Sequence, residues 1–110
     1  MARNSETITK TGIQKVVGWF ESKEIITVTD LLEGEVVGRK ETGEFGKLDA
    51  VNYPVVYGVA YDDSELALDG VTKKCSVIIG GEINKKFAKL PVGGEAITEI
   101  LLRDKAIYLR

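Results

Sequence analysis

The sequence predicts a small, mainly β protein of the α+β class with one or two short helices. Two observations carry this prediction. Short segments rich in β-branched residues recur along the chain, and such segments are typical of strands. The chain also has 12 glycines but only 2 prolines among its 110 residues, a balance that favours frequent turns between strands. This length fits one domain.

The first residues differ from the rest of the chain. Residues 1–11 are polar and show no periodic pattern, so we expect an extended N-terminal arm. Gly12 separates it from an apolar stretch, residues 13–20, which ends in the adjacent aromatic residues Trp19 and Phe20. Such a pair belongs either in the core of a small domain or at the centre of an interface, and the sequence leaves both open.

Six strands are expected after the arm. They are predicted at residues 23–29, 35–40, 45–48, 55–61, 74–83 and 107–109. Residues 41–44, with Gly43, predict a hairpin turn. The pair Gly80-Gly81 predicts a bulge or a close approach of two backbones.

Two short helices are expected near the C-terminal end. Asn84 is a suitable N-cap for a helix that Pro91 would end, over residues 84–90. Residues 95–105 predict the clearer helix, with three apolar residues, Ile97, Ile100 and Leu101, on one face.

Charge is unevenly distributed along the chain. The net charge is −2, but residues 1–23, 24–71 and 72–110 carry +2, −8 and +4. This polarity can orient association with other copies or with a charged surface, or it can reflect solvated faces alone. The net acidity disfavours nucleic acid as a partner. No apolar run approaches the ~20 residues of a membrane span, and the start resembles no signal peptide.

Known catalytic and metal-binding patterns are missing from the sequence. The chain has no His, the commonest general base and metal ligand. Its one cysteine, Cys75, alternates with Val77 and Ile79 and is expected to be buried. Asp62, Asp63 and Glu65 predict a solvated acidic turn instead of a calcium loop. We therefore expect a non-enzymatic protein with no cofactor, metal or small-molecule substrate.

Several segments, in their order and spacing, resemble a known family. They are Gly34–Gly38 (GEVVG), Thr42–Phe45 (TGEF), Val55–Ala60 (VVYGVA), Val77–Asn84 (VIIGGEIN) and Leu102–Arg110 (LRDKAIYLR). Together, across residues 24–110, they resemble the lambda-type bacteriophage head decoration proteins. One departure is Ala106, where many members of the family carry Gly.

The resemblance implies a fold, a partner and a location. It implies a β-tulip fold and a homotrimer that binds the major capsid protein on the outside of the mature head and stabilises the shell. Before assembly the protein would reside in the host cytoplasm. The arm would correspond to residues 1–22 and the β-rich decoration domain to residues 23–110. Our candidate partner-binding residues lie in the arm: Thr7, Ile8, Thr9, Ile13, Val16, Val17, Trp19 and Phe20.

A non-viral carrier module is the alternative interpretation. The turn at residues 32–38 is similar to that of domains that display biotin or lipoate, and Asp104-Lys105-Ala106 spells the lipoyl triplet. Such domains carry their lysine at a hairpin tip, whereas Lys105 falls at the end of a predicted helix. A small hydrolase, the third class, has no feature in its favour.

Overall fold

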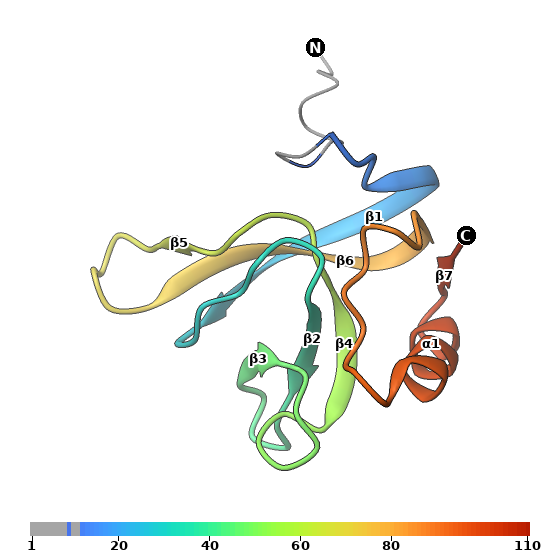
Figure 1. Ribbon diagram of the computed structural model, residues 1–110. Coiled ribbons are helices and arrows are strands. Elements are labelled where there is room, and N and C mark those ends of the chain that lie inside the picture. Colours follow the sequence, from blue (N-terminus) through green and yellow to red (C-terminus); the bar gives the residue numbers. More distant parts are fainter. Residues whose placement is uncertain (1–8, 10–11) are drawn as a thin grey trace.

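The computed structural model describes Thr9 and residues 12–110 of the chain, and Figure 1 shows its elements. The described part is mainly β, with one sheet and one helix. The strands are β1 (Val16–Thr27), β2 (Val36–Arg39), β3 (Phe45–Lys47), β4 (Val55–Ala60), β5 (Glu65–Leu66), β6 (Lys73–Ile83) and β7 (Ile107–Leu109). The helix is α1 (Glu95–Asp104).

Strand β6 organises the sheet. The main path runs β1-β6-β4-β2-β3, and β5 and β7 also pair with β6. β1 pairs with β6 from one end to the other, with a break in the register at residues 17–19, so the other three partners share the opposite edge of β6. In order along that edge they are β5 at Lys73 and Lys74, β4 at residues 77–78 and β7 at residues 81–83. Every pairing is antiparallel except β6 with β7.

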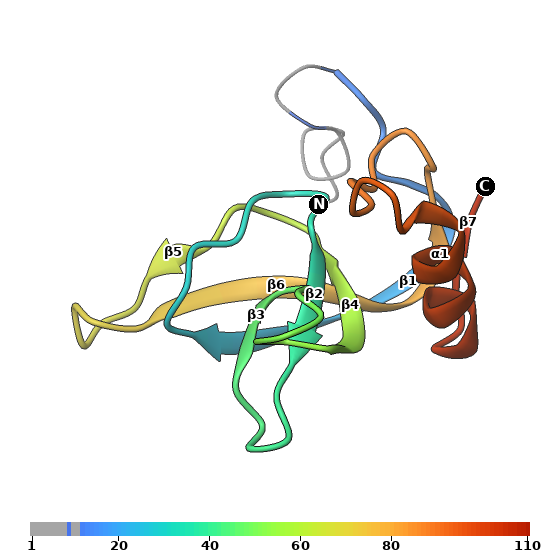
Figure 2. The same ribbon diagram turned by 60° about the horizontal axis from the view of Figure 1, so that its bottom comes forward.

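The sheet has a core on each face. Neighbouring residues such as Val36 and Val37, or Val77 and Ile78, belong to different buried clusters, because successive side chains of a strand point to opposite faces. The larger cluster includes Leu102 of α1 and Ile107 of β7. Figures 1 and 2 show α1 at one end of the molecule and the β5–β6 hairpin at the other.

Most predicted elements are confirmed. The strands expected at residues 35–40, 45–48, 55–61, 74–83 and 107–109 all form, each within a residue or two of its expected bounds, and so does the helix expected at 95–105. The hairpin turn forms at Gly43, whose φ is +95°. The glycine pair lies at a break in the β1–β6 register, as the expected bulge requires.

The prediction of a helix over residues 84–90 is wrong, because this segment forms no helix. Asn84 instead heads a turn, in which its carbonyl accepts the Phe87 N–H (2.9 Å) and its side-chain oxygen accepts the Lys86 N–H (3.0 Å). This is the local bonding by which Asn competes with helix formation. The segment then runs alongside residue 35, through a bridge between Glu35 and Lys89.

The first strand begins earlier than expected, at Val16 instead of Lys23. Residues 16–22, which the resemblance assigned to the arm, therefore lie in the sheet. Val16 and residues 20–22 pair with β6, and a break in the register falls between Val16 and Phe20. The valines and the aromatic pair are of types enriched in strands, but Gly18 interrupts them.

Candidate functional site

The candidate site is the uncovered stretch of β1, residues 17–24. Each of these eight residues is exposed, whereas Val16 before them and Ile25 after them are buried. β1 stands at the end of the sheet order and, in the described part of the chain, pairs only with β6. The backbone is therefore held along one edge, while the other edge carries no strand of the described residues and the side chains of the stretch are exposed to a partner.

Trp19 and Phe20 are the largest side chains of this stretch. The Trp19 side chain is 57% exposed and Phe20 is 37% exposed, so neither belongs to the core. The Phe20 ring stacks on Tyr61, with ring centroids 5.4 Å apart and planes 9° from parallel. The aromatic pair is thus presented at the surface in a fixed geometry, a property of interface residues.

The glycine pair of β6, Gly80 and Gly81, leaves room for Trp19 and Phe20 to lie close against β6. Gly81 has a φ of +131°, and a Cβ there would overlap the Trp19 carbonyl oxygen and the Phe20 backbone. At Gly80 a Cβ would lie 3.5 Å from the Trp19 ring, so the indole lies over a residue without a side chain. The two strands approach closely here because Gly81 offers no Cβ.

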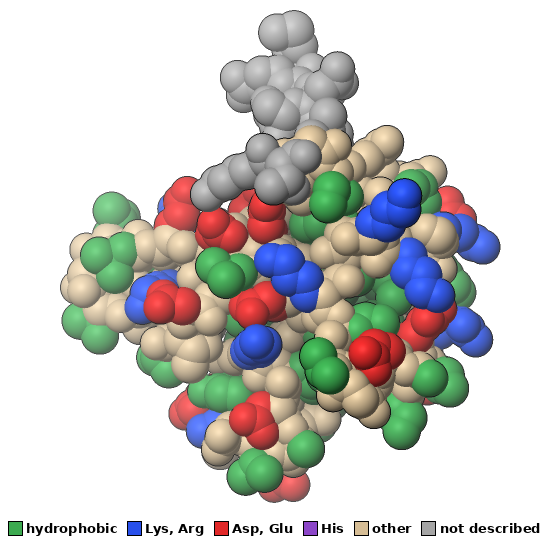
Figure 3. Space-filling model, viewed as in Figure 1, with side chains coloured by type: hydrophobic (Ala, Val, Ile, Leu, Met, Phe, Trp, Pro, Cys, Tyr) green, Lys and Arg blue, Asp and Glu red, His purple; other side chains and the backbone are tan. Residues whose placement is uncertain are grey.

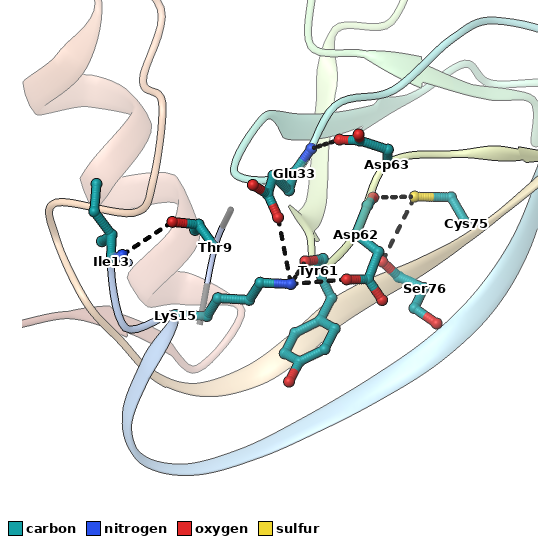
Figure 4. A network of polar contacts seen from close by, with 9 residues as sticks. All are labelled: Thr9, Ile13, Lys15, Glu33, Tyr61, Asp62, Asp63, Cys75 and Ser76. Atoms are coloured by element: carbon teal, nitrogen blue, oxygen red, sulfur yellow. Dashed lines mark hydrogen bonds and ion pairs between the residues drawn. The ribbon is translucent and has the colours of Figure 1, made fainter. Parts of the chain in front are cut away.

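A buried lysine anchors the beginning of β1. The Lys15 side chain is only 3% exposed. Its ammonium donates to Asp62 Oδ1 (2.7 Å) and to the Tyr61 carbonyl (2.8 Å) and lies 3.4 Å from Glu33 Oε2, as Figure 4 shows. It also lies 4.3 Å from the centre of the Tyr61 ring. A buried charge needs such a full set of partners, so this network fixes where the N-terminal segment enters the sheet.

Lys15 was not among the residues that the sequence singled out. Its partner Asp62 lies 47 positions away along the chain, and a lysine within an apolar stretch carries no local sign of an ion pair.

The network borders the one cysteine, Cys75, which is a free and buried thiol. Cys75 is buried, with Sγ 3.3 Å from the Asp62 carbonyl oxygen. Burial raises its pKa to about 11, and the carboxylates of Asp62, Asp63 and Glu35 add to this effect. The thiol is therefore protonated at neutral pH and a poor nucleophile. The burial of Cys75 confirms the expectation from the sequence.

The structure brings together only part of the predicted partner-binding set. Thr7 and Ile8 lie outside the described residues. The Thr9 hydroxyl accepts the Ile13 N–H at 3.0 Å, and Ile13 is half-buried and packs against the core. Val16 is buried in that core. Val17, Trp19 and Phe20 remain as exposed apolar members of the set.

The carboxylates form no metal centre in the described residues. No three of the Asp, Glu and Cys side chains of Thr9 and residues 12–110 lie where they could hold a metal ion together. Asp49 and Asp69 instead fold back on their own turns, and hydrogen bonds from the neighbouring residues lower the pKa of both. Within the same residues, no helix has the length and apolar character to cross a membrane.

Comparisons with family models, with curated proteins and with solved structures found no match to this chain.

Proposed function

We propose that this chain is a bacteriophage head decoration protein. It binds the major capsid protein on the outer surface of the mature head as a homotrimer and reinforces the shell against internal pressure. The β-tulip fold of that family is part of the proposal. The observation that carries it is the uncovered stretch of β1, because a twelve-residue strand with eight consecutive exposed residues is suited to binding another protein more than to filling a core.

The chemistry of this stretch fits a protein surface as partner. The unpaired edge of β1 presents backbone N–H and C=O groups to which an extended segment can pair, and side chains next to such an edge supply specificity. Val17, Trp19 and Phe20 add apolar contact beside that edge. Three chains that bind one lattice together would do so with an avidity well above that of a single contact.

Anchoring at both ends lets β1 bind without disturbing the domain. Lys15 and Val16 hold its start, and Ile25 and Thr27 hold its end, where the Thr27 hydroxyl donates to the Phe45 carbonyl at 2.8 Å. A partner therefore meets a preformed surface, and little ordering of the strand is required on binding.

The test is co-sedimentation with expanded heads assembled from the major capsid protein of the same phage genome, with unexpanded heads as the control. Replacing Trp19 by Ala is expected to weaken binding about 30-fold, since a tryptophan at an interface centre contributes about 2 kcal/mol or more. Val51, exposed on a distant loop, provides the matched control variant, Val51→Ala. Full binding by the Trp19 variant, or none by the wild-type chain, would contradict the proposal.

The contribution of the arm needs a separate variant. Removing residues 1–20 would also remove Lys15 and Val16 from the buried network and the core, so lost binding could reflect unfolding. A chain without residues 1–8 keeps both. If residues 1–8 contribute to capsid binding, this shorter chain will bind heads with a lower affinity than the full chain. The thermal midpoints of the two chains, measured alongside, show whether the loss of affinity comes with a loss of stability.

The carrier alternative gains no support from the position of its lysine. Lys105 is the C-cap residue of α1, whereas lipoyl and biotinyl lysines occupy hairpin tips. An intact mass equal to that of the unmodified chain, after expression in cells supplied with lipoate and biotin, would eliminate it.

A further inference from the structure

The helix α1 turns its apolar face outward. Ile97, Ile100 and Leu101, which the sequence places together on one face, are 68%, 54% and 41% exposed. The buried residues of α1 are Thr98 and Leu102. A surface helix normally buries its apolar face, and an uncovered apolar face of this kind marks a site where another protein binds.

A second set of exposed apolar residues lies on the β5–β6 hairpin. Leu66, Leu68 and Val71 are all exposed, and Leu68 makes essentially no contact with the rest of the chain. The turn between them is firmly built. The Asp69 carboxylate accepts hydrogen bonds from the N–H groups of Val71 and Thr72, each at 2.9 Å, and from the Thr72 hydroxyl at 2.7 Å. The apolar side chains are thus carried on an ordered projection.

These two surfaces cannot meet within one molecule. β5 pairs with the first residues of β6, at Lys73 and Lys74, while β7, beside α1, pairs with the last, at residues 81–83. At about 3.4 Å per residue, roughly 27 Å of strand separates them. Both ribbon views show the hairpin and α1 at opposite ends of the molecule.

The charges around the two surfaces are complementary. Residues 62–74, which hold the hairpin turn and the paired ends of β5 and β6, contain four acidic residues and two lysines, for a net charge of −2. Residues 84–105, which are α1 and the segment before it, contain five basic and three acidic residues, for a net charge of +2. The segment before the helix, residues 84–92, lies beside α1, where Lys85 Nζ is 3.5 Å from Glu99 Oε1. Figure 3 shows hydrophobic side chains at both ends and Lys and Arg side chains gathered on the side of α1. Apolar surfaces with opposite charged surroundings favour contact with each other over contact with themselves.

We propose that the β5–β6 hairpin of one copy docks on the outward face of α1 of the next copy. Leu68 and its neighbours would cover Ile97, Ile100 and Leu101, with the net negative segment 62–74 facing the lysines of residues 84–92. Such a contact is head-to-tail, and head-to-tail contacts close into rings when the rotation between copies permits. The number of copies in the ring, three, rests on the proposed function. The contact itself can be tested without a capsid.

Two variants, each disabling one half of the contact, test its head-to-tail nature. Ile97→Glu/Ile100→Glu removes the helix half, and Leu68→Glu removes the hairpin half. Because these residues are exposed, both variants are expected to keep the thermal midpoint of the wild type. Each alone should lose self-association at least tenfold, as measured by sedimentation velocity over a concentration series. Mixed together they should form 1:1 dimers, since one intact helix face and one intact hairpin remain. No dimer in the mixture, with wild-type chains that associate, would overturn the proposal.

Disulfide trapping measures the contact even if it is weak. Chains with Leu68→Cys are mixed with chains with Ile97→Cys under mild oxidation, and Cys75 stays in place because it is buried. The matched control pairs Val51→Cys with Ile97→Cys, since residue 51 is also highly exposed but lies elsewhere. We expect the hairpin pair to form crosslinked dimers at least ten times faster than the control pair. Equal rates would overturn the proposal.

The outcomes separate this inference from the proposed function. Rapid crosslinking without binding to expanded heads would leave the contact standing and contradict capsid decoration. Binding to heads without crosslinking, in solution or on the heads, would leave decoration standing and overturn the contact.

Discussion

Replacing Gly81 by Ala is expected to remove a large part of the folding stability, through two separate effects. The first is local. Gly81 has a φ of +131°, a backbone conformation that residues with a Cβ rarely adopt, and holding Ala there costs about 1–3 kcal/mol.

The second effect comes from the neighbouring strand. The new Cβ would overlap the carbonyl oxygen of Trp19 and the Cα of Phe20. These are backbone atoms of a paired strand, so no side-chain rotation can relieve the overlap, and β1 must shift away from β6. Forced shifts of this kind cost about 1–3 kcal/mol. Together the two effects amount to about 2–6 kcal/mol, against a total stability of about 5–15 kcal/mol for a typical domain.

Urea and thermal unfolding, followed by circular dichroism, measure this loss. A loss of 3 kcal/mol corresponds to a midpoint lower by about 12 °C or more. Two further glycines separate the causes. Gly43→Ala, at a φ of +95° with no atom within 4 Å of the new Cβ, should show the conformational strain alone, about 1–2 kcal/mol. Gly80→Ala, whose Cβ would meet the Trp19 ring at an ordinary 3.5 Å, should cost less than Gly81→Ala. If Gly81→Ala is no more destabilising than Gly43→Ala, the close approach of β1 to β6 does not constrain this position.

Three other predictions concern the anchor, the cysteine and the end of the helix. Lys15→Ala should destabilise the chain by about 2–4 kcal/mol, because it leaves carboxylates unpaired and exposes a core edge; Lys23→Ala, an exposed lysine of the same strand, is the control and should change stability by less than about 0.5 kcal/mol. The raised pKa of Cys75, about 11 against 9.0 for the free group, means that the folded state holds this proton more tightly than the unfolded chain. The contribution of this proton to stability is therefore full below pH 9.0 and is lost as the pH rises toward 11. In urea titrations across this range, the free energy of unfolding should decline less for Cys75→Ala than for the wild type. Identical declines would contradict the prediction. Ala106 has a φ of +62° just after α1, where Gly is the favoured residue. Ala106→Gly should therefore raise the free energy of unfolding by about 0.5–1 kcal/mol in the same titrations. A free energy of unfolding no higher than that of the wild type would show that the turn tolerates the Cβ.

The parts of the fold that could be predicted are those with a strong local pattern. Residues 73–83 and 55–60 are dense in β-branched side chains, and α1 begins with an acidic residue, Glu95, and has Arg103 in its last turn, as the helix dipole favours. The parts that could not be predicted depend on partners distant in sequence. β1 extends back to Val16 because β6 pairs with it, and no pattern within residues 16–22 indicates that pairing.

Only part of the candidate site could be predicted from the sequence. The sequence left open whether the aromatic pair, Trp19 and Phe20, lies in the core or at an interface. The structure places both residues at the surface, because no other element of the described residues packs over this part of β1. The orientation of α1 was beyond local reasoning for a different reason. Periodicity identifies which residues share a face, but Thr98 and Leu102 face inward because of where β4 and β7 place the helix. Ile97, Ile100 and Leu101 consequently face solvent.

The exposed strand and the exposed helix face have a common physical basis. A small domain buries only about two-thirds of its surface, so each apolar residue left outside removes burial that folding could have used. This chain compensates at few positions: the buried Lys15 network, the close approach at Gly81, and core clusters on both faces of the sheet. Those positions hold β1 and α1 by backbone pairing and by a few inward side chains, which leaves Trp19 and Ile97 exposed. Stability thus depends on the inward residues of these elements, and both proposals predict that variants of the exposed residues impair association without unfolding the domain.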